Sequence, residues 1–337
     1  MKSTLRFALI GCGRIADRHA TEMVKHGQLA AVCDIVKEKA DTVAEKFAAI
    51  PYYSISDLLA NEKGIDVVAI CTPNGLHSEH SILSMQAGHH VLCEKPMALS
   101  STDAGRMIET AATSGKQLFI VKQNRFNPPV AFVKQLLENK KLGKIFSFQI
   151  NCFWNRPPAY YQHSWLGTKE LDGGTLFTQF SHFIDLLYWL LGDVAAASGI
   201  RSNYAHKDMI EFEDTGVAFL QMTDGPIGTI HYTINSHPAN MEGSLVVFGE
   251  KGTVKIGGQY LNELEYFSVE GMDKPDLPEG NPPNQYGFYQ GSMSNHDKVY
   301  EMLVRAVNEP SFSFITTGET RKAIEIIEKI YGASPLV

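Results

Sequence analysis

Three consecutive residues, Glu94, Lys95 and Pro96, follow an apolar run that is typical of a buried strand. Residues 91–93 (Val-Leu-Cys) suit a parallel sheet, and Pro96 interrupts the hydrogen-bond ladder because it has no amide proton. Pro96 would also fix the chain direction, for which a cis peptide bond is one solution. Carboxyl ends of strands in an open parallel sheet line its ligand crevice. An ammonium group there can hydrogen-bond a reacting hydroxyl or ketone oxygen, and we predict this role for Lys95.

A glycine-rich turn, with Gly11, Gly13 and Ala16 in the pattern G-x-G-x-x-A, lies between a predicted strand and a predicted helix (15–26). Gly11 permits the tight turn, Gly13 lets a pyrophosphate approach the backbone, and Ala16 allows close packing of helix on strand. The phosphates would lie at the helix N-terminus, where the macrodipole favours anions. The alternative is an ordinary turn between a strand and a helix.

Asp34 ends the second predicted strand, about 20 residues after the glycines, where a carboxylate holds the ribose hydroxyls of a dinucleotide. Because a carboxylate repels a 2′-phosphate, NAD is predicted in preference to NADP. A solvated acid at a strand end is the alternative. With NAD in this place, Glu94 and Lys95 are predicted to lie beside the nicotinamide. The predicted cofactor contacts also include Arg14, Ile15 and Gln123.

Strand and helix patterns alternate through about residue 122, which predicts a doubly wound parallel sheet with helices, an α/β domain spanning 1–122. From residue 123 onward the pattern changes. Several stretches alternate in period 2 and are separated by glycine turns, as in an antiparallel sheet with one covered face. We therefore predict a second, α+β domain over 123–337, containing a mostly antiparallel open sheet. Residues 271–291 are predicted to form a long loop with little core material.

Composition excludes several classes of protein. The 337 residues are 44% apolar and 20% charged, with a net charge of −7, which argues against a nucleic-acid partner. No apolar run approaches the ~20 residues of a membrane span, and the start of the chain leads directly into a strand. The five cysteines form no C-x-x-C pair, so neither a metal site nor a disulfide framework is predicted. Reduced thiols fit a cytoplasmic protein.

At these motifs the sequence resembles a known family. The stretches GCGRIADRHA, CTPNGLH, CEKPMAL and GGTLFTQFSHFID are similar to those of the Gfo/Idh/MocA oxidoreductases. The resemblance covers essentially the whole chain. It implies a Rossmann domain followed by an α+β domain whose open sheet often mediates oligomers, and hence a homodimer or homotetramer. It implies that Lys95 reaches both the nicotinamide ribose and the substrate, and that the cofactor wall includes Thr72, Pro73, Asn74 and His77.

The sequence departs from the common family pattern near His182. The family usually has an aspartate four residues before this histidine and often a glycine two before it, where this chain has Thr178 and Phe180. Without that acid, His182 is the predicted general base. The alternative is a packed histidine on an apolar helix. Asp185, one helical turn later, is predicted at most to orient His182.

Other stretches resemble the UDP-N-acetylglucosaminuronic acid 3-dehydrogenase subgroup, which makes precursors of surface polysaccharides: VKQNRFNPP, FWNRPPAYYQHSWLGTKELDGGTL and HFIDLLYWLLGD. The resemblance implies a nucleotide-sugar substrate whose carboxylate and diphosphate need cationic and polar partners. An arginine fork suits either anion. The predicted substrate contacts, besides Lys95 and His182, are Arg125, Asn155, Arg156, Tyr160, Thr178 and Gln179. Three alternatives stay open, namely an interdomain salt bridge for Arg125, a dehydrogenase of a free sugar or inositol, and a non-catalytic NAD-binding regulator.

Overall fold

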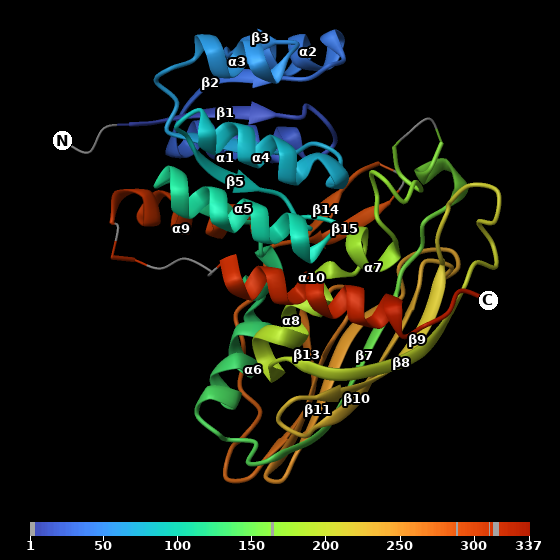
Figure 1. Cartoon of the computed structure of the whole chain (residues 1–337). Coiled ribbons are helices and arrows are strands. Elements are labelled where there is room, and N and C mark those ends of the chain that lie inside the picture. The colour runs from blue at the N-terminus through green and yellow to red at the C-terminus, as the bar shows by residue number, and fades with distance from the viewer. Residues whose placement is uncertain (1–3, 163–164, 288, 310, 313–316) are drawn as a thin grey trace. The chain divides into compact units, whose positions relative to one another are not determined.

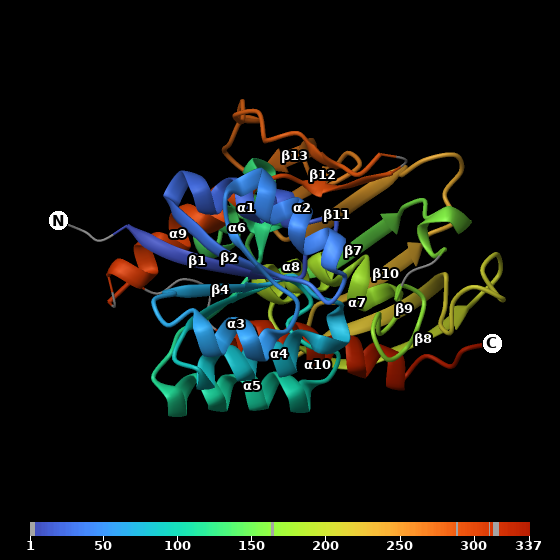
Figure 2. The same ribbon diagram turned by 90° about the horizontal axis from the view of Figure 1, so that it is seen from above.

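The computed structural model of the chain describes residues 4–162, 165–287, 289–309, 311–312 and 317–337 (Figures 1 and 2). The chain forms two compact units. The first unit comprises Met1–Val121 and His296–Ile324, and the second comprises Lys122–Asn295 and Glu325–Val337.

The first unit contains a six-stranded parallel sheet in the order β3-β2-β1-β4-β5-β6. This is the strand order of a doubly wound dinucleotide-binding fold, so the predicted α/β architecture is confirmed. The strands are β1 (Leu5–Ile10), β2 (Gly27–Cys33), β3 (Ile50–Tyr52), β4 (Val67–Ile70), β5 (His90–Cys93) and β6 (Leu118–Ile120). The helices that connect them are α1 (Ala16–His26), α2 (Lys37–Phe47), α3 (Ile55–Asn61), α4 (His77–Gln86), preceded by the 3-10 turn η1 (Asn74–Leu76), and α5 (Ser101–Ser114).

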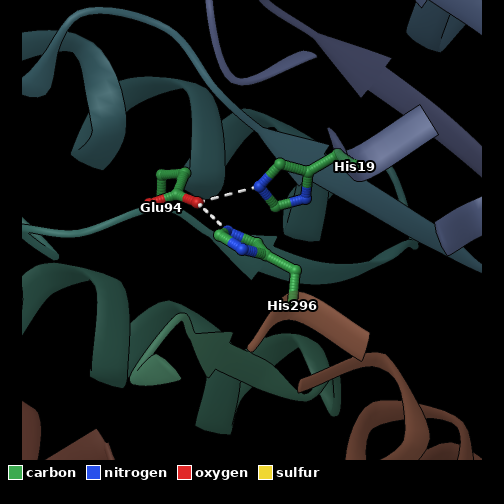
Figure 3. Close-up of side chains that lie close together, drawn as sticks. All are labelled: His19, Glu94 and His296. Atoms are coloured by element: carbon green, nitrogen blue, oxygen red, sulfur yellow. Dashed lines mark hydrogen bonds and ion pairs between the residues drawn. The ribbon is translucent and has the colours of Figure 1, made fainter. Parts of the chain in front are cut away.

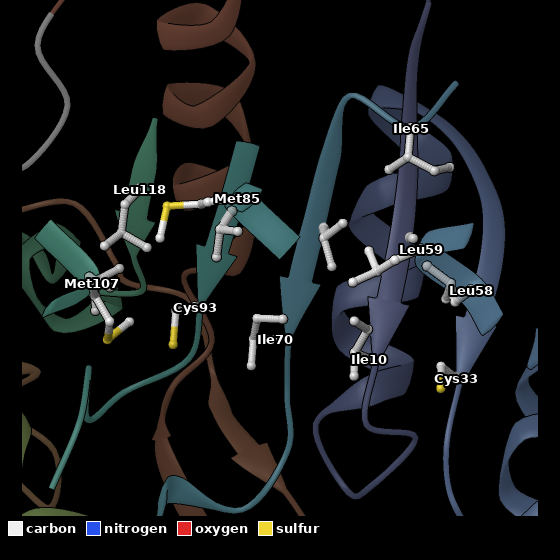
Figure 4. Packing of buried hydrophobic residues seen from close by; sticks show 14 of the residues in the cluster. Ile10, Cys33, Leu58, Leu59, Ile65, Ile70, Met85, Cys93, Met107 and Leu118 are labelled. Carbon is white, nitrogen blue, oxygen red and sulfur yellow. The ribbon is translucent and has the colours of Figure 1, made fainter. Parts of the chain in front are cut away.

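The core of this sheet is built from side chains on neighbouring strands and the helices beside them (Figure 4). Ile10, Ile70 and Cys93 stand near the carboxyl ends of three adjacent strands and are buried. Met85 and Met107 contribute from α4 and α5. Because strands buried on both faces read as continuous apolar runs, this part of the fold was predictable from the sequence.

The helix α9 (His296–Asn308) belongs to the first unit, although it comes late in the chain. Its buried face carries Val299, Tyr300 and Leu303, and it packs against α1. The Tyr300 ring lies 6.0 Å from that of Phe7 and 6.3 Å from that of His26. The prediction that everything after residue 122 forms the second domain is therefore wrong for this segment. An amphipathic helix shows that it covers a core, but its sequence does not say which core.

The second unit contains a seven-stranded sheet in the order β13-β12-β11-β7-β10-β9-β8. Only the pair β7 and β10 is parallel, so the predicted mostly antiparallel sheet is confirmed. The strands are β7 (Ile145–Phe153), β8 (Val194–Ser202), β9 (Thr215–Met222), β10 (Ile227–Thr233), β11 (Glu242–Gly249), β12 (Gly252–Gly257) and β13 (Glu263–Val269). The helical elements after β6 are η2 (Gln123–Phe126), α6 (Pro128–Glu138), η3 (Pro158–Tyr160), α7 (Thr175–Thr178), α8 (Ser181–Leu191) and, near the end of the chain, α10 (Thr317–Gly332).

The two faces of this sheet differ in burial. One face is covered by the apolar side of α8, where the Phe180 ring, just before the helix, lies 6.0 Å from that of Tyr232 on β10. The other face leaves large apolar side chains exposed, among them Phe219, Ile227 and Tyr266. The strands alternate between these faces with period 2, as predicted.

Residues 271–291, predicted to be a long loop, contain part of a short hairpin formed by β14 (Pro283–Gln285) and β15 (Gln290–Met293). The hairpin was missed because proline, asparagine and glycine are poor strand formers. Among the described helices, none has the length and apolarity that a membrane crossing requires.

Candidate active site

The glycine turn has the geometry that a dinucleotide phosphate requires. Gly11 adopts φ +97°, and a Cβ atom there would lie 2.5 Å from the carbonyl oxygen of Cys71, so only glycine fits. A Cβ atom on Gly13 would meet nothing within 4 Å, which leaves that side of the turn open for a ligand. No side chain caps the first turn of α1, and helix N-termini of this kind bind anions. The turn therefore fits the pyrophosphate of NAD.

Asp34 follows β2 and is fixed to the backbone on both sides. Its Oδ2 atom accepts the amide of Cys12 at 2.8 Å, and its Oδ1 atom accepts the amide of Val36 at 2.8 Å. Burial, helped by the negative charge of Asp34, raises the pKa of the Cys12 thiol to about 12. Asp34 is thus part of the turn and not a freely solvated strand-end acid. Its half-buried carboxylate retains lone pairs that could accept ribose hydroxyls.

The loop after β4 contains the predicted cofactor-wall residues and is tied to the loop after β5 by His77. The ring of His77 is buried, with Nδ1 2.7 Å from the carbonyl oxygen of Pro96 and Nε2 2.9 Å from that of Thr72. Burial lowers the pKa of His77, and the two carbonyl oxygens oppose that shift. Asn74, also buried, begins η1 beside this loop. His77 therefore holds together the ends of two adjacent strands.

Glu94 lies in a buried cluster that the sequence did not predict (Figure 3). Its Oε1 atom is 2.8 Å from Nε2 of His19 and 3.1 Å from Nε2 of His296, while Oε2 accepts the amide of Lys95 at 3.0 Å. The peptide bond between Lys95 and Pro96 is cis. Burial by itself raises the pKa of Glu94, but the hydrogen bonds from both imidazoles outweigh it and hold the pKa well below its usual range.

This geometry changes the interpretation of the Glu-Lys-Pro motif. The carboxylate of Glu94, which was predicted to contact the cofactor, instead makes its described hydrogen bonds to His19, His296 and the backbone amide of Lys95. Lys95 is half-buried at the same strand end. His19 was available to sequence reasoning in the stretch DRHA, but His296 lies some 200 residues away and gave no local signal.

In the second unit, Arg125 forms a buried ion pair with Asp185. Its Nε and Nη2 atoms lie 2.9 Å from the two carboxylate oxygens, and Lys122 Nζ is 2.9 Å from Oδ1 of the same residue. The guanidinium also stacks on Trp189 at 4.9 Å. Burial raises the pKa of Asp185, but its two cationic neighbours more than reverse this and lower it far below its usual range.

These contacts correct two predictions. Asp185 serves Lys122 and Arg125, so its main role is not to orient His182. The fork of Arg125 is already filled by a carboxylate, and that carboxylate belongs to the same unit. The Nε and Nη2 atoms of Arg125 are therefore already paired inside the second unit, and this ion pair is not the interdomain salt bridge considered above. Sequence reasoning could not separate these roles, because spacing alone does not show which acid an arginine meets.

Arg156 has a very different environment, although it is also buried, with only 2% of its surface exposed. Its Nε atom donates to Oε1 of Gln179 at 2.7 Å, and Nη1 donates to the carbonyl of Asn155 and to Oδ1 of Asn240. Aromatic rings surround the guanidinium at 5.0–5.4 Å, namely those of Trp154, Tyr160 and Tyr289. Within the described part of the chain, every hydrogen-bond partner of this cation is neutral.

Three further predicted substrate residues lie in the same cluster. Gln179 bridges Arg156 and Tyr160, since its Nε2 donates to the Tyr160 hydroxyl at 3.0 Å. Burial raises the pKa of Tyr160 to about 12, so the phenol stays protonated at neutral pH. Asn155 donates its side-chain amide to the carbonyl of Ser236. The sequence-predicted residues Asn155, Arg156, Tyr160 and Gln179 are thus brought together.

The region around α7 and α8 supplies the remaining candidates. His182 is buried in the first turn of α8. The hydroxyl of Thr178, at the position where the family usually has an acid, pairs with the buried carboxylate of Asp172. Sequence reasoning missed Asp172, which belongs to the stretch LDGG. Gln123 donates to Ser292 at 3.1 Å, and its buried Oε1 atom has no hydrogen-bond partner among the described residues.

Comparisons with known proteins agree with this geometry. Residues 5–122 match the family described as "Oxidoreductase family, NAD-binding Rossmann fold", and residues 130–255 match the GFO/IDH/MocA C-terminal domain. The WlbA dehydrogenase from Bordetella pertussis, solved in complex with NADH and UDP-GlcNAcA, is 33% identical with a TM-score of 0.87, covering 98% of this chain and 96% of that one. The WlbA dehydrogenase from Chromobacterium violaceum, in complex with the same two molecules, is 32% identical with a TM-score of 0.89, covering 99% and 94%.

A curated relative with a different substrate is also similar. The D-glucoside 3-dehydrogenase of Escherichia coli (strain K12) is 29% identical over 238 residues, which are 68% of this chain and 67% of the relative. The first family match covers most of the first unit's N-terminal segment, and the second match lies within the second unit. This chain belongs to the Gfo/Idh/MocA family and is an NAD-dependent sugar or polyol oxidoreductase.

Proposed function

We propose that this enzyme oxidises the C3 hydroxyl of a UDP-linked N-acetyl-hexosaminuronic acid, with NAD as the hydride acceptor. The observation that carries the proposal is Arg156, a buried guanidinium whose described hydrogen-bond partners are all neutral. Burying an unpaired charge is costly, so an arginine in this state is suited to an anionic ligand. A uronic acid carboxylate or a diphosphate matches its planar fork.

The whole-length similarity to two WlbA dehydrogenases, each solved with UDP-GlcNAcA, supports the same substrate class. Around Arg156, the amide of Gln179 and the hydroxyl of Tyr160 add neutral polar groups that could bind sugar hydroxyls. Aromatic rings on several sides strengthen a site of this kind, because they exclude water around the cation while stabilising it through cation–π contacts.

Bound NAD supplies the hydride acceptor, and the chain's own residues handle the proton and the oxygen. As the C3 hydrogen leaves with its electron pair, His182 takes the hydroxyl proton, a role that usually contributes 10²–10⁴-fold. Lys95 holds the same oxygen and stabilises its developing negative charge. Thr178 cannot accept a proton at neutral pH, and its hydroxyl pairs with Asp172, so we infer a hydrogen-bonding role for it. The products are a 3-keto sugar, NADH and one proton.

The test of substrate class compares charged and neutral sugars. Isothermal titration would measure binding of UDP-GlcNAcA, UDP-GlcNAc and free inositol to the wild type, Arg156→Lys and Arg156→Met, each loaded with NAD. We expect Arg156→Met to weaken UDP-GlcNAcA binding by about 10- to 150-fold, from the 1.5–3 kcal/mol of a hydrogen bond to a charged group. Arg156→Lys should recover only part of the loss, because an ammonium lacks the bidentate fork.

Arg201 provides the matched control. It also stacks on an aromatic ring, that of Tyr331 at 4.3 Å, but it already has a carboxylate partner in Glu213 at 3.0 Å. Arg201→Met should lower the melting temperature and leave the preference among the three ligands unchanged. If the wild type binds or oxidises free inositol and ignores both nucleotide sugars, the substrate proposal is wrong.

The role assignments have a separate test. In single-turnover experiments with bound NAD, His182→Asn and Lys95→Ala should each slow the appearance of NADH absorbance at least 100-fold while NAD still binds. Near-wild-type rates in both variants would show that other groups move the proton and hold the oxygen.

A second candidate, oxidation of a neutral glycoside, is favoured by the D-glucoside 3-dehydrogenase relative. It makes a different prediction for Arg156. A neutral glycoside gives the guanidinium no anion to bind, so kcat/KM for that substrate would change little between the wild type and Arg156→Lys. Measuring kcat/KM for methyl glucoside beside UDP-GlcNAcA therefore separates the two candidates.

A further inference from the structure

We propose that His19, His296 and Tyr300 are positioning residues that hold the ionised carboxylate of Glu94 against the backbone amide of Lys95. The proposal rests on the role assigned above to Lys95 and extends it to residues that do not touch the substrate. It follows from the contacts of Glu94. One carboxylate oxygen meets both imidazoles (Figure 3), and the other accepts the backbone amide of Lys95 at 3.0 Å.

An ionised Glu94 decides which imidazole nitrogens donate to it. An ionised carboxylate can only accept, so both His19 Nε2 and His296 Nε2 must donate to Oε1. His19 Nδ1, 2.8 Å from the hydroxyl of Tyr300, then serves as an acceptor for that hydroxyl. His296 Nδ1 is buried and has no hydrogen-bond partner among the described residues, as expected for a neutral ring. The negative charge of Glu94 is thus shared among three N–H donors.

A fixed negative charge next to Lys95 has two consequences. It stabilises the ammonium form of a neighbouring amine, because opposite charges favour ionisation. It also fixes the backbone direction at the residue where the side chain begins, and a misplacement of about 1 Å can cost 10²-fold in rate. Both effects are lost if the carboxylate is neutralised or released.

The cluster also explains why α9 belongs to the first unit. His19 comes from α1, Glu94 follows β5, and His296 and Tyr300 come from α9, so three distant segments meet at one carboxylate. All four side chains are at least nine-tenths buried, and a buried carboxylate without donors would be strongly unfavourable. Among the described residues, the other titratable or charged groups that interact with members of this cluster include Arg18, Glu22, Cys71, His77 and Cys93.

A metal ion is the competing interpretation. The donor atoms of His19, Glu94 and His296 lie within 4.8 Å of one another, and two histidines with one carboxylate are a known zinc ligand set. The separations of 2.8 and 3.1 Å between Glu94 Oε1 and the two Nε2 atoms are those of direct hydrogen bonds. Ligands of one tetrahedral zinc ion, at about 2.0–2.1 Å from the metal, would stand roughly 3.3 Å apart. The geometry favours hydrogen bonds.

The test uses pairs of substitutions that keep or remove the relevant donor. Glutamine places an N–H near the Nε2 position of histidine, whereas leucine keeps bulk and offers no donor. Glu94→Gln removes the charge. Its oxygen can keep the Lys95 amide while its NH₂ group donates to both imidazoles, provided that His296 moves its proton to the unpartnered Nδ1 and His19 moves its proton to Nδ1, toward the Tyr300 hydroxyl. The matched control is His89→Leu, a buried histidine of the same unit whose Nδ1 lies 2.8 Å from the carbonyl of Ile65, away from Glu94.

With saturating NAD and the substrate proposed above, we expect Glu94→Gln and His296→Leu to lower kcat about 10- to 100-fold. KM and the dissociation constant of NAD should change less than threefold. His296→Gln should recover most of kcat, and His89→Leu should lower only the melting temperature. If kcat stays within twofold of wild type in both Glu94→Gln and His296→Leu, or if His296→Gln is as slow as His296→Leu, the positioning role is refuted.

A second measurement needs no substrate, so it stands even if the proposed function fails. Acylation of Lys95 by an amine reagent, followed by mass spectrometry at one fixed pH, should proceed several times faster in Glu94→Gln than in the wild type, since loss of the anion favours the neutral amine. An unchanged labelling rate would overturn the proposal. So would a stoichiometric metal ion in the purified wild type that is lost in His296→Leu.

Discussion

Replacing Asp34 tests how the first unit selects its cofactor. The carboxylate is anchored by the amides of Cys12 and Val36, each at 2.8 Å. These two bonds hold it at the end of β2, beside the glycine turn, with lone pairs left for a ribose. We propose that this arrangement makes the enzyme prefer NAD to NADP, because the carboxylate accepts the ribose hydroxyls and repels a 2′-phosphate.

The magnitude follows from the bonds that are lost. A hydrogen bond to a charged group contributes roughly 1.5–3 kcal/mol, and partial replacement by water reduces the net loss. Asp34→Ala should therefore weaken NAD binding by about 1–3 kcal/mol, which is a roughly 5- to 150-fold rise in Kd. NADP binding should weaken much less or improve, since the repulsion disappears as well. The ratio of the two Kd values is the quantity most sensitive to the carboxylate.

Asp34→Asn separates charge from anchoring. Its side-chain oxygen can keep one of the two backbone amides, but its NH₂ group would face the other donor. We expect Asn to lose most of the discrimination between NAD and NADP and to keep more of the turn's rigidity than Ala. Asp41→Ala is the control, because this acid on α2 bonds only the hydroxyl of Tyr53 among the described residues.

The assay is titration calorimetry of nucleotide-free protein with NAD and NADP separately. Copurifying nucleotide would have to be removed by partial unfolding and refolding, and its mass would identify the physiological cofactor directly. Equal affinity of the wild type for NAD and NADP would refute the reasoning. So would an Asp34→Ala variant whose Kd for NAD stays within twofold of that of Asp41→Ala.

Three other predictions concern stability and assembly. Asp185→Asn should cost about 3–5 kcal/mol in urea unfolding, because it leaves the buried cations of Lys122 and Arg125 without their anion; a cost below 1 kcal/mol would contradict the ion-pair interpretation. Burial lowers the pKa of His296, so the unfolded chain takes up a proton before the folded protein does as pH falls below about 6.5. The free energy of unfolding should therefore fall by up to ~1.4 kcal/mol per pH unit from this group. In thermal melts, His296→Gln should show a smaller dependence of the unfolding free energy on pH. We propose that the exposed sheet face binds a second copy of the chain. Phe219 on this face is 62% exposed, so Phe219→Glu should lower the mass measured by light scattering from that of a dimer or tetramer to that of a monomer. A wild type that is monomeric at micromolar concentration would exclude this.

Much of the fold could be predicted because its signals are local. Alternation of apolar runs with amphipathic helices predicted the parallel sheet, and Gly11 marked a turn that no other residue could form. Period-2 alternation predicted the second sheet. The position of α9 could not be predicted in this way, because its apolar face would suit the core of either unit. Only the packing of Tyr300 against Phe7 and His19 shows which core it covers.

The candidate site was predicted where a motif fixes a backbone position and less well where a side chain's partner decides its role. Asp34 and Lys95 stand at strand ends, as the motif required. Glu94 was predicted to face the cofactor, yet it faces two histidines, one of them brought from 200 residues away. A motif says where a carboxylate is placed, but its direction depends on donors that come from other segments.

Arg125 and Arg156 show the same limit for charge. Both are buried, both stack on tryptophan, and both were predicted as substrate contacts from the same sequence resemblance. Arg125 meets a carboxylate in a bidentate pair, whereas the described partners of Arg156 are carbonyl and amide oxygens. Since hydrogen bonds to neutral acceptors leave a buried cation uncompensated in charge, the two environments imply different functions. Arg125 stabilises the unit that contains it, and Arg156 is the residue whose substitution should change which ligands the enzyme accepts.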